Sequence, residues 1–432
     1  MKAHEATGPS LWQSLADPGP ARPALRGRES AEIVVVGAGI AGLSLALHLA
    51  EAGRRPVVLE AETPGAGALG ASAGIIAPQL VRDTPAGVLS KLGPTLGDSW
   101  LRLVAESGSY LFDLIAREKI GCDARPQGFI APSANGEALA ELERARDEWA
   151  PYRGGIRVLD RDDVASMTGC VGYRAGILDE TGGCLDPLQL ARGLAERAEA
   201  KGARIFDNSR VRSIASAGAG WRLATRQGVI DTPQVVLCAN GGNVLHPHLD
   251  QTVLPMHIYE MATEPLPEAM QREVLPGGQC MTDMELDIFS IRYAAEGRLV
   301  TAYPVSHRQS LAEVETQVND RLARMLARAL PVKIAHLWHG TAWINSSLLP
   351  RIVMVEPGMI AVQACNGRGI ATNNIIGREI SRMLLSGGDY HTELACPAPS
   401  KISRFWLAQR LPNMITSAAL SMRRLRSTFG RR

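Results

Sequence analysis

The sequence predicts an α/β protein in which a Rossmann-like domain is joined to a second, α+β domain built on an antiparallel sheet. The first observation is a β-branched run at residues 32–36 that leads into a glycine turn and then into good helix formers as far as residue 52. A second short strand at residues 56–60 completes a β-turn-α-β unit. The other observation is a region of mostly strand-like segments from about residue 246 to residue 343, with one helix at 314–330. A second glycine turn, at residues 365–369, again joins a strand to a helix.

Composition and charge indicate a globular protein with a sizeable core. Of 432 residues, 46% are hydrophobic and 21% charged, and this length suits two or three domains or one large α/β enzyme. A net charge of +2 is too small to attract nucleic-acid phosphates to the protein as a whole, so we expect no nucleic-acid partner. Seven scattered cysteines without a C-x-x-C pair favour a reducing, cytoplasmic location over a zinc module or disulfide framework. We expect neither a signal peptide nor a membrane span, because no apolar run reaches the ~18 residues that a span requires.

The first glycine turn has the spacing G-x-G-x-x-G, with Gly37, Gly39 and Gly42. It follows a strand, opens a helix and is trailed by an acidic residue, Glu60, at the end of the next strand. The first glycine permits a tight turn, the second lets the backbone approach a pyrophosphate, and the third allows close packing of helix on strand. The helix N-terminus offers amides to the anion, and Glu60 would accept hydrogen bonds from the adenosine ribose. The pattern therefore predicts a dinucleotide site, with FAD and NAD both open.

The next segment, residues 63–76, favours FAD because it is long, small and apolar. Its backbone could lie against a large flat ring system with few side chains between them. A nicotinamide-binding fold rarely needs such a loop. We therefore expect FAD as the cofactor.

The chain resembles the D-amino-acid oxidase-like (DAO) superfamily of FAD-dependent amine oxidoreductases over nearly its whole length. The resemblance rests on residues 33–49 and 57–61, Gly70-Ala-Ser-Ala-Gly74, Gly182-Gly-Cys-Leu-Asp-Pro187 and Asn366-Gly-Arg-Gly-Ile-Ala371. Residues 10–12, 262–266 and 292–298 look more narrowly like the γ-glutamylputrescine oxidase-like branch, which stands beside the glycine and sarcosine oxidase-like branches.

The resemblance implies a Rossmann-like FAD-binding domain in discontinuous pieces and an antiparallel substrate domain over the flavin. We expect an extended N-terminal arm at 1–30, the FAD-binding domain at 31–107, 181–245 and 346–398, the substrate domain at 108–180 and 246–345, and a basic C-terminal helix and tail at 399–432. The implied reaction passes a hydride from the amine-bearing carbon of an amine or amino acid to flavin N5. An imine and then a carbonyl product result, with release of ammonia or an amine. The electron acceptor stays open between O2 and a quinone or protein.

The resemblance also implies the FAD contacts. The backbone of residues 366–370 and the helix after it would direct positive dipole at flavin N1 and C2=O. Val211 would lie beside the adenine, and residues 239–241 near the pyrophosphate. Ser72 and Ala73 stand where some relatives attach flavin to histidine, so the FAD is expected to be non-covalent. The predicted contacts are Gly37, Gly39, Ile40, Ala41, Gly42, Glu60, Ala61, Gly70, Ala71, Ser72, Ala73, Gly74, Ile75, Val211, Ala239, Asn240, Gly241, Asn366, Gly367, Arg368, Gly369 and Ile370.

The substrate side offers fewer signals. His257, Tyr259 and Met261 alternate, so they would share one face of a strand and are candidate cavity residues, although such side chains also complete protein cores. Arg368 could add its charge at the flavin or meet a substrate carboxylate. The predicted catalytic set is His257, Tyr259, Arg292, His339 and Arg368, with Trp343 as a further cavity candidate. His246-Pro-His248 lacks a third ligand at a useful spacing, so we expect no metal site.

Three departures from the family pattern leave the substrate open. Ala371 stands where sarcosine oxidases place a carboxylate-binding lysine, Cys184 where the γ-glutamylputrescine branch usually has histidine, and residues 346–350 lack an acidic residue. The leading substrates are γ-glutamylputrescine-like or D-amino-acid-like amines. One alternative is oxidation of a 2-hydroxy acid on the same fold, which would yield a keto acid without ammonia. The other is an accessory flavoprotein subunit that acts on a protein partner.

The last stretch, residues 401–432, holds eight Lys or Arg and no Asp or Glu, with aromatic and aliphatic residues among them. A basic helix packed on the body of the protein is the plainer interpretation. Peripheral contact with acidic lipid headgroups at the inner membrane face is the alternative.

Overall fold

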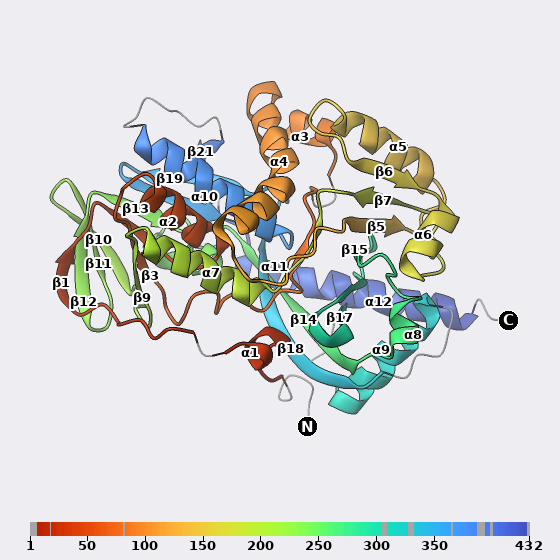
Figure 1. Ribbon diagram of the computed structural model, residues 1–432. Coiled ribbons are helices and arrows are strands. Elements are labelled where there is room, and N and C mark those ends of the chain that lie inside the picture. The colour runs from red at the N-terminus through yellow and green to blue at the C-terminus, as the bar shows by residue number, and fades with distance from the viewer. Residues whose placement is uncertain are drawn as a thin grey trace.

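The computed structural model describes residues 7–17, 19–80, 83–303, 309–326, 332–363, 366–386, 394–397 and 401–429. In Figure 1 the chain forms two lobes side by side, one around strands β2 (Ile33–Val36) and β13 (Gln234–Leu237), the other around β14 (Leu254–Pro265) and β17 (Arg298–Tyr303). Helix α4 (Pro94–Glu118) stands between the lobes. Each lobe contains one large sheet, and the α/β fold class is confirmed.

The first sheet has seven strands in the order β21-β19-β20-β13-β2-β3-β9. Strands β20, β13, β2, β3 and β9 are parallel to one another, whereas β19 is antiparallel to β20. The strand Ile33-Val-Val-Val36 is buried throughout, as expected for a β-branched run in a parallel sheet that is covered on both faces. The other strands of this sheet are β3 (Val57–Leu59), β9 (Arg204–Phe206), β19 (Arg351–Glu356), β20 (Met359–Gln363) and β21 (Ala395–Pro397).

Helices α2 (Ile40–Glu51), α7 (Pro187–Ala200) and α10 (Gly369–Leu385) cover one face of this sheet. Helix α2 packs against both of the others. The opposite face packs against a smaller sheet of order β1-β12-β11-β10, through a core that includes Trp221, Leu223 and Ile230. The strands of that sheet are β1 (Gly27–Ser30), β10 (Ser213–Ala217), β11 (Gly220–Ala224) and β12 (Gly228–Thr232).

The second large sheet has eight strands in the order β18-β14-β17-β16-β15-β5-β7-β6. Its pairs are antiparallel except for β15 with β5, which is parallel. The antiparallel sheet predicted for the second lobe is therefore present, with one parallel pair inside it. Besides β14 and β17, the strands of this sheet are β5 (Phe129–Ser133), β6 (Ile156–Leu159), β7 (Ala175–Asp179), β15 (Cys280–Thr282), β16 (Ser290–Tyr293) and β18 (Ile334–Ile344).

Helices close the outer sides of this second sheet. Helix α9 (Leu311–Met325) packs on it through Val314, Val318 and Leu322, and a capping box of Ser310 and Glu313 starts the helix. The helix predicted at 314–330 thus begins three residues earlier, and residues 327–330 lie outside the described residues. The other elements are α3 (Pro85–Leu92), α5 (Ala138–Trp149), α6 (Arg161–Thr168), α8 (Glu268–Gln271), β4 (Ile75–Ile76), β8 (Gly183–Cys184) and the 3-10 turns Asn240–Leu245 and Ala295–Gly297.

The N-terminal arm departs from the extended form expected for residues 1–30. It contains helix α1 (Leu11–Leu15), which starts with a capping box between Ser10 and Gln13. Leu11 and Trp12 are buried at 0% and 2% exposure. The helix forms because this short cap satisfies its first amides while both large side chains leave water. Residues 27–30 then join the small sheet as β1.

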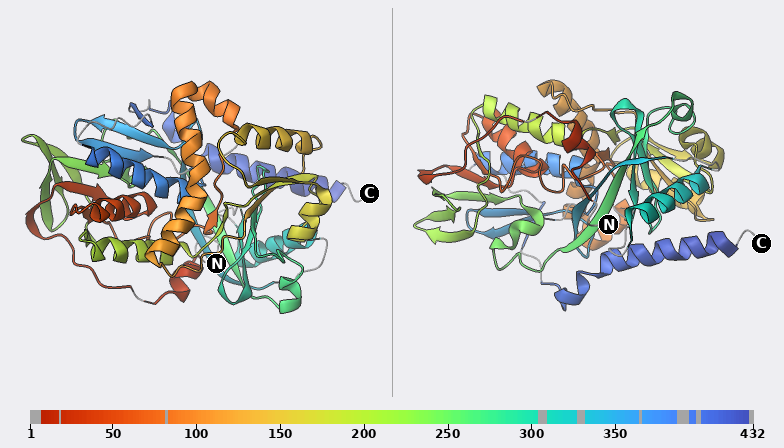
Figure 2. Two further views of the ribbon diagram at one scale, coloured as in Figure 1. Left: turned by 45° about the horizontal axis from the view of Figure 1, so that its top comes forward. Right: turned by 90° about the horizontal axis from the view of Figure 1, so that it is seen from below.

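The C-terminal part of the chain returns to the second lobe. Figure 2 shows the long helix α12 (Leu411–Phe429) lying along the outside of that lobe, after the short helix α11 (Phe405–Ala408). The Asn413 side chain accepts a hydrogen bond from the backbone amide of His257 at 3.1 Å and donates one to the His257 carbonyl at 2.8 Å. It thereby pairs the edge of β14 where β17 has ended. Within the described residues, no helix is long and apolar enough to cross a bilayer.

A buried ion pair ties β7 to the segment after α5. Arg153 and Asp179 meet at 2.5 Å with side-chain exposures of 6% and 0%. We expect Asp179→Asn to lower the free energy of unfolding by about 3 kcal/mol, because it leaves a buried guanidinium without its counter-charge. The exposed pair of Arg146 and Asp147 provides the control, and Asp147→Asn should change stability by less than about 0.5 kcal/mol. Equilibrium urea unfolding of both variants measures this, and equal stabilities would contradict the prediction.

Candidate active site

A cavity of about 1410 Å³ extends from the glycine turn after β2 to the inner face of the second large sheet. Its lining comes from both lobes. The first lobe contributes the turn after β2, the end of β3 and the loop at 66–75, and the second contributes β14, β16 and β18. A ligand in this space would therefore touch both large sheets.

The three glycines of the first turn have different surroundings. Gly37 has a φ of +105°, and a Cβ there would lie 3.1 Å from the Cys238 carbonyl. A Cβ on Gly42 would collide with the carbonyl oxygen of Gly37. A Cβ on Gly39, by contrast, would meet nothing within 4 Å and would enter the cavity. Two of the glycines therefore serve packing, and the third leaves space for a ligand.

Glu60 lies at the end of β3 and points back at this turn. Its Oε2 accepts a hydrogen bond from the Ala38 amide at 2.7 Å, and its Oε1 accepts one from the Glu62 amide at 3.0 Å. Glu60 and Val211 both line the cavity. This places the carboxylate where the ribose of a dinucleotide would lie in such a fold.

The loop at 66–75 is held from outside by two tryptophans. The Trp338 indole donates to the Ala71 carbonyl at 2.9 Å, and the Trp12 indole donates to the Ser72 carbonyl at 2.8 Å. The two rings pack edge to face at 6.3 Å. Gly74 has a φ of +70°, and a Cβ there would collide with the Leu185 carbonyl. The loop backbone is therefore fixed against the cavity by groups from α1, β18 and the start of α7.

The second glycine turn leads into α10 at the opposite side of the cavity. Asn366 and Gly367 have φ values of 49° and 80°, and the Asn366 Oδ1 accepts a hydrogen bond from the Asn345 amide at 3.0 Å. The Arg368 guanidinium donates to the Leu80 carbonyl at 3.2 Å. One turn into α10, the buried Asn373 lines the cavity with its Oδ1 unpaired. An unpaired buried oxygen beside the free amides of a helix N-terminus fits a polar ligand group.

The structure brings nearly all the predicted cofactor residues to this cavity. The exceptions are Gly42, Gly70 and Gly241. Each of these is a packing position, because a Cβ would collide with Gly37, with Gly65 and with the Trp343 ring respectively. The remaining surroundings are consistent with a bound FAD: small residues next to open space, a carboxylate at the strand end and helix amides at the far side.

The predicted catalytic residues are placed differently. Arg368 lines the cavity, as does Trp343, but His257, Tyr259 and His339 do not. On β14 the lining residues are Met256, Ile258 and Glu260, which alternate with His257 and Tyr259. The expectation that the histidine and the tyrosine face the cavity is therefore wrong. Period-two alternation correctly grouped these side chains but did not say which group faces inward.

The predicted catalytic residues that do not line the cavity make contacts elsewhere in the protein. Tyr259 belongs to the core that packs on α9, and its ring lies 5.9 Å from that of His339. His257 is exposed and its Nδ1 lies 3.1 Å from the Thr341 hydroxyl. Arg292 is 1% exposed and does not line the cavity, and its guanidinium stacks on the Trp12 ring at 4.6 Å. These side chains therefore make their contacts outside the cavity lining.

Sequence reasoning missed the inward residues of the second sheet. Glu260, Ser290 and Ala302 all line the cavity and stand in neighbouring strands. A carboxylate inside an otherwise apolar strand was the available signal, since Glu260 lies between Tyr259 and Met261.

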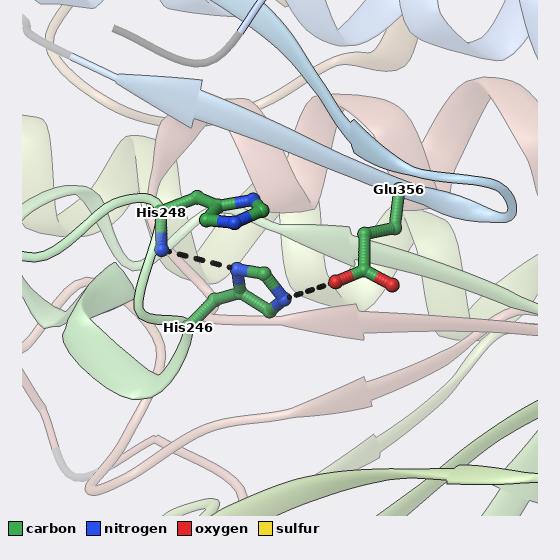
Figure 3. A group of neighbouring side chains, drawn as sticks. All are labelled: His246, His248 and Glu356. Carbon is green, nitrogen blue, oxygen red and sulfur yellow. Dashed lines mark hydrogen bonds and ion pairs between the residues drawn. The ribbon is translucent and has the colours of Figure 1, made fainter. Parts of the chain in front are cut away.

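His246 and His248 acquire a third neighbour that the sequence did not indicate. Glu356, at the end of β19, places an oxygen 2.9 Å from the His246 Nε2, and the ligand atoms of all three residues lie within 4.8 Å of one another (Figure 3). The His248 amide donates to the His246 Nδ1 at 3.4 Å. The ring proton of neutral His246 therefore lies on Nε2, where it faces Glu356. The premise that the two histidines lack a third ligand type nearby is therefore wrong, and the structure describes the three residues as a hydrogen-bonded group.

The fold and the cavity define a class: a two-lobed protein whose Rossmann-type dinucleotide site opens onto a largely antiparallel sheet. Residues 32–383 match the DAO family model, described as FAD dependent oxidoreductase. The chain belongs to this family. It is an FAD-dependent oxidoreductase.

Individual relatives agree with this assignment. Gamma-glutamylputrescine oxidoreductase of Escherichia coli (strain K12) is 29% identical over 82% of this chain and 83% of its own length. Among solved structures, glycine oxidase from Geobacillus kaustophilus has a TM-score of 0.69 at 18% identity, covering 84% of this chain and 96% of that one. L-proline dehydrogenase from P. horikoshii has a TM-score of 0.70 at 15% identity, covering 89% and 98%. The structural likenesses show the shared fold.

The two kinds of glycine can be separated by mutation. Gly39 has a φ of −81°, which any residue adopts, so Gly39→Val should leave the stability of the FAD-free protein unchanged. Its side chain would enter the cavity and raise the Kd for FAD by about 100-fold. Gly42→Val should instead destabilise the protein, because the side chain meets backbone. Quenching of FAD fluorescence measures the Kd, and thermal unfolding measures stability. Normal FAD binding by Gly39→Val would refute the assignment.

Proposed function

We propose that the protein oxidises an amine or amino acid at the bound flavin, giving an imine and then a carbonyl product with release of ammonia or an amine. The observation that carries the proposal is the charge of the cavity wall opposite the dinucleotide site. Four lining residues from the second lobe are acidic: Glu141, Glu260, Asp283 and Glu285. Among the described lining residues, that lobe contributes no Lys or Arg. Such a wall favours a substrate that carries positive charge.

FAD, when bound, would accept the hydride from the substrate carbon. The chain's own residues would bind and orient the substrate amine between the acidic wall and the glycine turn before α10. The names of the relatives support an amine: one is a gamma-glutamylputrescine oxidoreductase and another a glycine oxidase. A 2-hydroxy acid, the alternative on this fold, has no cationic group that the acidic wall could bind. Arg368, beside the glycine turn before α10, is a lining cation that a substrate carboxylate would meet.

Anaerobic bleaching of the flavin tests this proposal directly. We expect at least one amine from a panel of γ-glutamyl-polyamines, polyamines, N-methyl amino acids and D-amino acids to bleach the holoenzyme. Admission of air then identifies the acceptor, since rapid recolouring indicates O2 and slow recolouring a quinone or protein acceptor. Release of FAD by acid precipitation would support non-covalent attachment. Bleaching by 2-hydroxy acids alone would overturn the amine proposal. No bleaching at all, with co-purification of a partner, would favour an accessory subunit.

We further propose that helices α11 and α12 attach the protein peripherally to an anionic membrane surface, at the cytoplasmic side. Their exposed large apolar residues are Trp406, Leu407, Leu411, Met414, Ile415 and Met422. Lys401, Arg404 and Arg410 are exposed nearby, and residues 401–432 contain no acid. A helix with exposed apolar and basic residues suits the headgroup region of anionic lipids. Pro412, Ile415 and Thr416 also border the cavity, so such contact would place the cavity close to the membrane.

Vesicle sedimentation tests this attachment. We expect the protein to sediment with phosphatidylglycerol vesicles at low salt and to stay in solution with phosphatidylcholine vesicles. The double variant Trp406→Ser/Met414→Ser should lose most of the binding, because both side chains are at least 60% exposed and support no core. Leu139→Ser, an exposed apolar residue on α5, provides the control. Equal sedimentation with both lipids would contradict the proposal.

A further inference from the structure

Glu260 on β14 is one of the acidic residues of the cavity wall. Within the second large sheet it pairs with Ala302 on β17, and the Ala302 amide donates to the Ser290 hydroxyl on β16 at 3.2 Å. Glu260, Ala302 and Ser290 therefore form one row across three strands, and all three line the cavity. Because Ala302 and Ser290 are small, the carboxylate has open space beside it.

One oxygen of the Glu260 carboxylate has no hydrogen-bond partner in the protein. The residue is 6% exposed, and its Oε2 is buried without a hydrogen-bond partner. Burial raises the pKa of Glu260 to about 8, and the charge of Arg292 opposes that shift. A buried carboxylate without a hydrogen bond is costly, and such groups in a cavity usually await a ligand.

Arg292 does not neutralise this region by itself. Its guanidinium is closed off from solvent, and α1 covers it through the Trp12 ring. Burial raises the pKa of Asp186 as it raises that of Glu260, and the charge of Arg292 opposes both shifts. The pKa of Cys184 is lowered, mainly by the hydrogen bond with Cys280 and further by Arg292. One guanidinium thus acts on three ionisable groups, and the Oε2 of Glu260 still lacks a hydrogen-bond partner. A cation in front of Glu260 would supply that donor.

We propose that Glu260 is a specificity-determining residue that binds the positively charged amino group of the substrate through its carboxylate. The inference rests on the proposed amine oxidation and narrows it to substrates that carry an alkylammonium group in front of β14. Polyamines and their mono-acylated derivatives have this chemistry, whereas a simple amino acid carries a carboxylate beside its ammonium group, and Glu260 would repel that carboxylate. The ammonium would donate to the unpaired oxygen and replace the hydrogen bond that the protein does not supply.

An inert cation separates binding from turnover. tert-Butylammonium has no hydrogen on the carbon that bears the nitrogen, so the flavin cannot oxidise it. We would titrate it into the holoenzyme and follow the perturbation of the flavin absorbance. Wild type should bind, and Glu260→Gln should raise the Kd by about 30-fold, because a charge-assisted hydrogen bond is lost. Glu264→Gln is the matched control, since Glu264 lies on the same strand but is exposed.

The pH dependence gives a second readout. The Glu260 carboxylate forms as the pH rises through about 8, the pKa that burial imposes. An alkylammonium stays protonated over this range, so its affinity for wild type should rise about 10-fold from pH 7 to pH 9. In Glu260→Gln the profile should be flat. If Glu260 had only a structural role, Glu260→Gln would change the stability of the protein but would show the same pH profile of binding as wild type.

Each outcome decides a different claim. If tert-butylammonium binds through Glu260 but no amine bleaches the flavin, amine oxidation fails and the cation site stands. If wild type and Glu260→Gln bind the probe equally, or if wild type does not bind it, the inference is overturned. If Glu260→Gln does not fold, Ala302→Leu fills the space beside the carboxylate instead and should cause the same loss. Normal probe binding by Ala302→Leu would then overturn the inference.

Discussion

Two indole hydrogen bonds hold the loop at 66–75 in place, and the shape of the cavity depends on them. Trp338 and Trp12 donate to the carbonyls of Ala71 and Ser72, which follow each other along the loop. A loop of small residues has little side-chain packing of its own. Neighbouring elements therefore hold it by donating hydrogen bonds to its backbone carbonyls. One donor comes from the second large sheet and the other from the N-terminal arm. Arm, loop and sheet therefore fix this part of the cavity wall together.

The arm has a second effect through the same side chain. The Trp12 ring covers the guanidinium of Arg292, which is thereby removed from water beneath the substrate wall. A buried guanidinium and a buried carboxylate in one low-dielectric region influence each other strongly. Helix α1 thus influences the electrostatics of the cavity although it does not line it. Deletion of a short N-terminal segment that includes Trp12 would therefore change the electrostatics of the substrate site.

The two ends of the chain meet the second lobe on different sides. Helix α1 packs beside Trp338 and over Arg292, outside the cavity lining, whereas α12 pairs the edge of β14 through Asn413 and borders the cavity with Ile415. Strand β17 pairs with β14 as far as Tyr259, and Asn413 hydrogen-bonds the backbone of His257 just beyond that point. The basic C-terminal segment therefore completes the sheet as well as presenting an exposed apolar surface.

The sequence by itself determined the dinucleotide site, because its physics is local. A tight turn at Gly37, open space at Gly39 and the acid at Glu60 are set by residues that lie close together in the chain, and all three line the cavity. The substrate wall was decided by tertiary structure. The alternation along β14 allowed either His257 with Tyr259 or Ile258 with Glu260 to face inward, and the packing of α9 on one face chose the second pair. Likewise, Glu356 meets His246 only because two distant strands fold together. Contacts between segments far apart in sequence leave no local pattern, so the chain alone could not predict them.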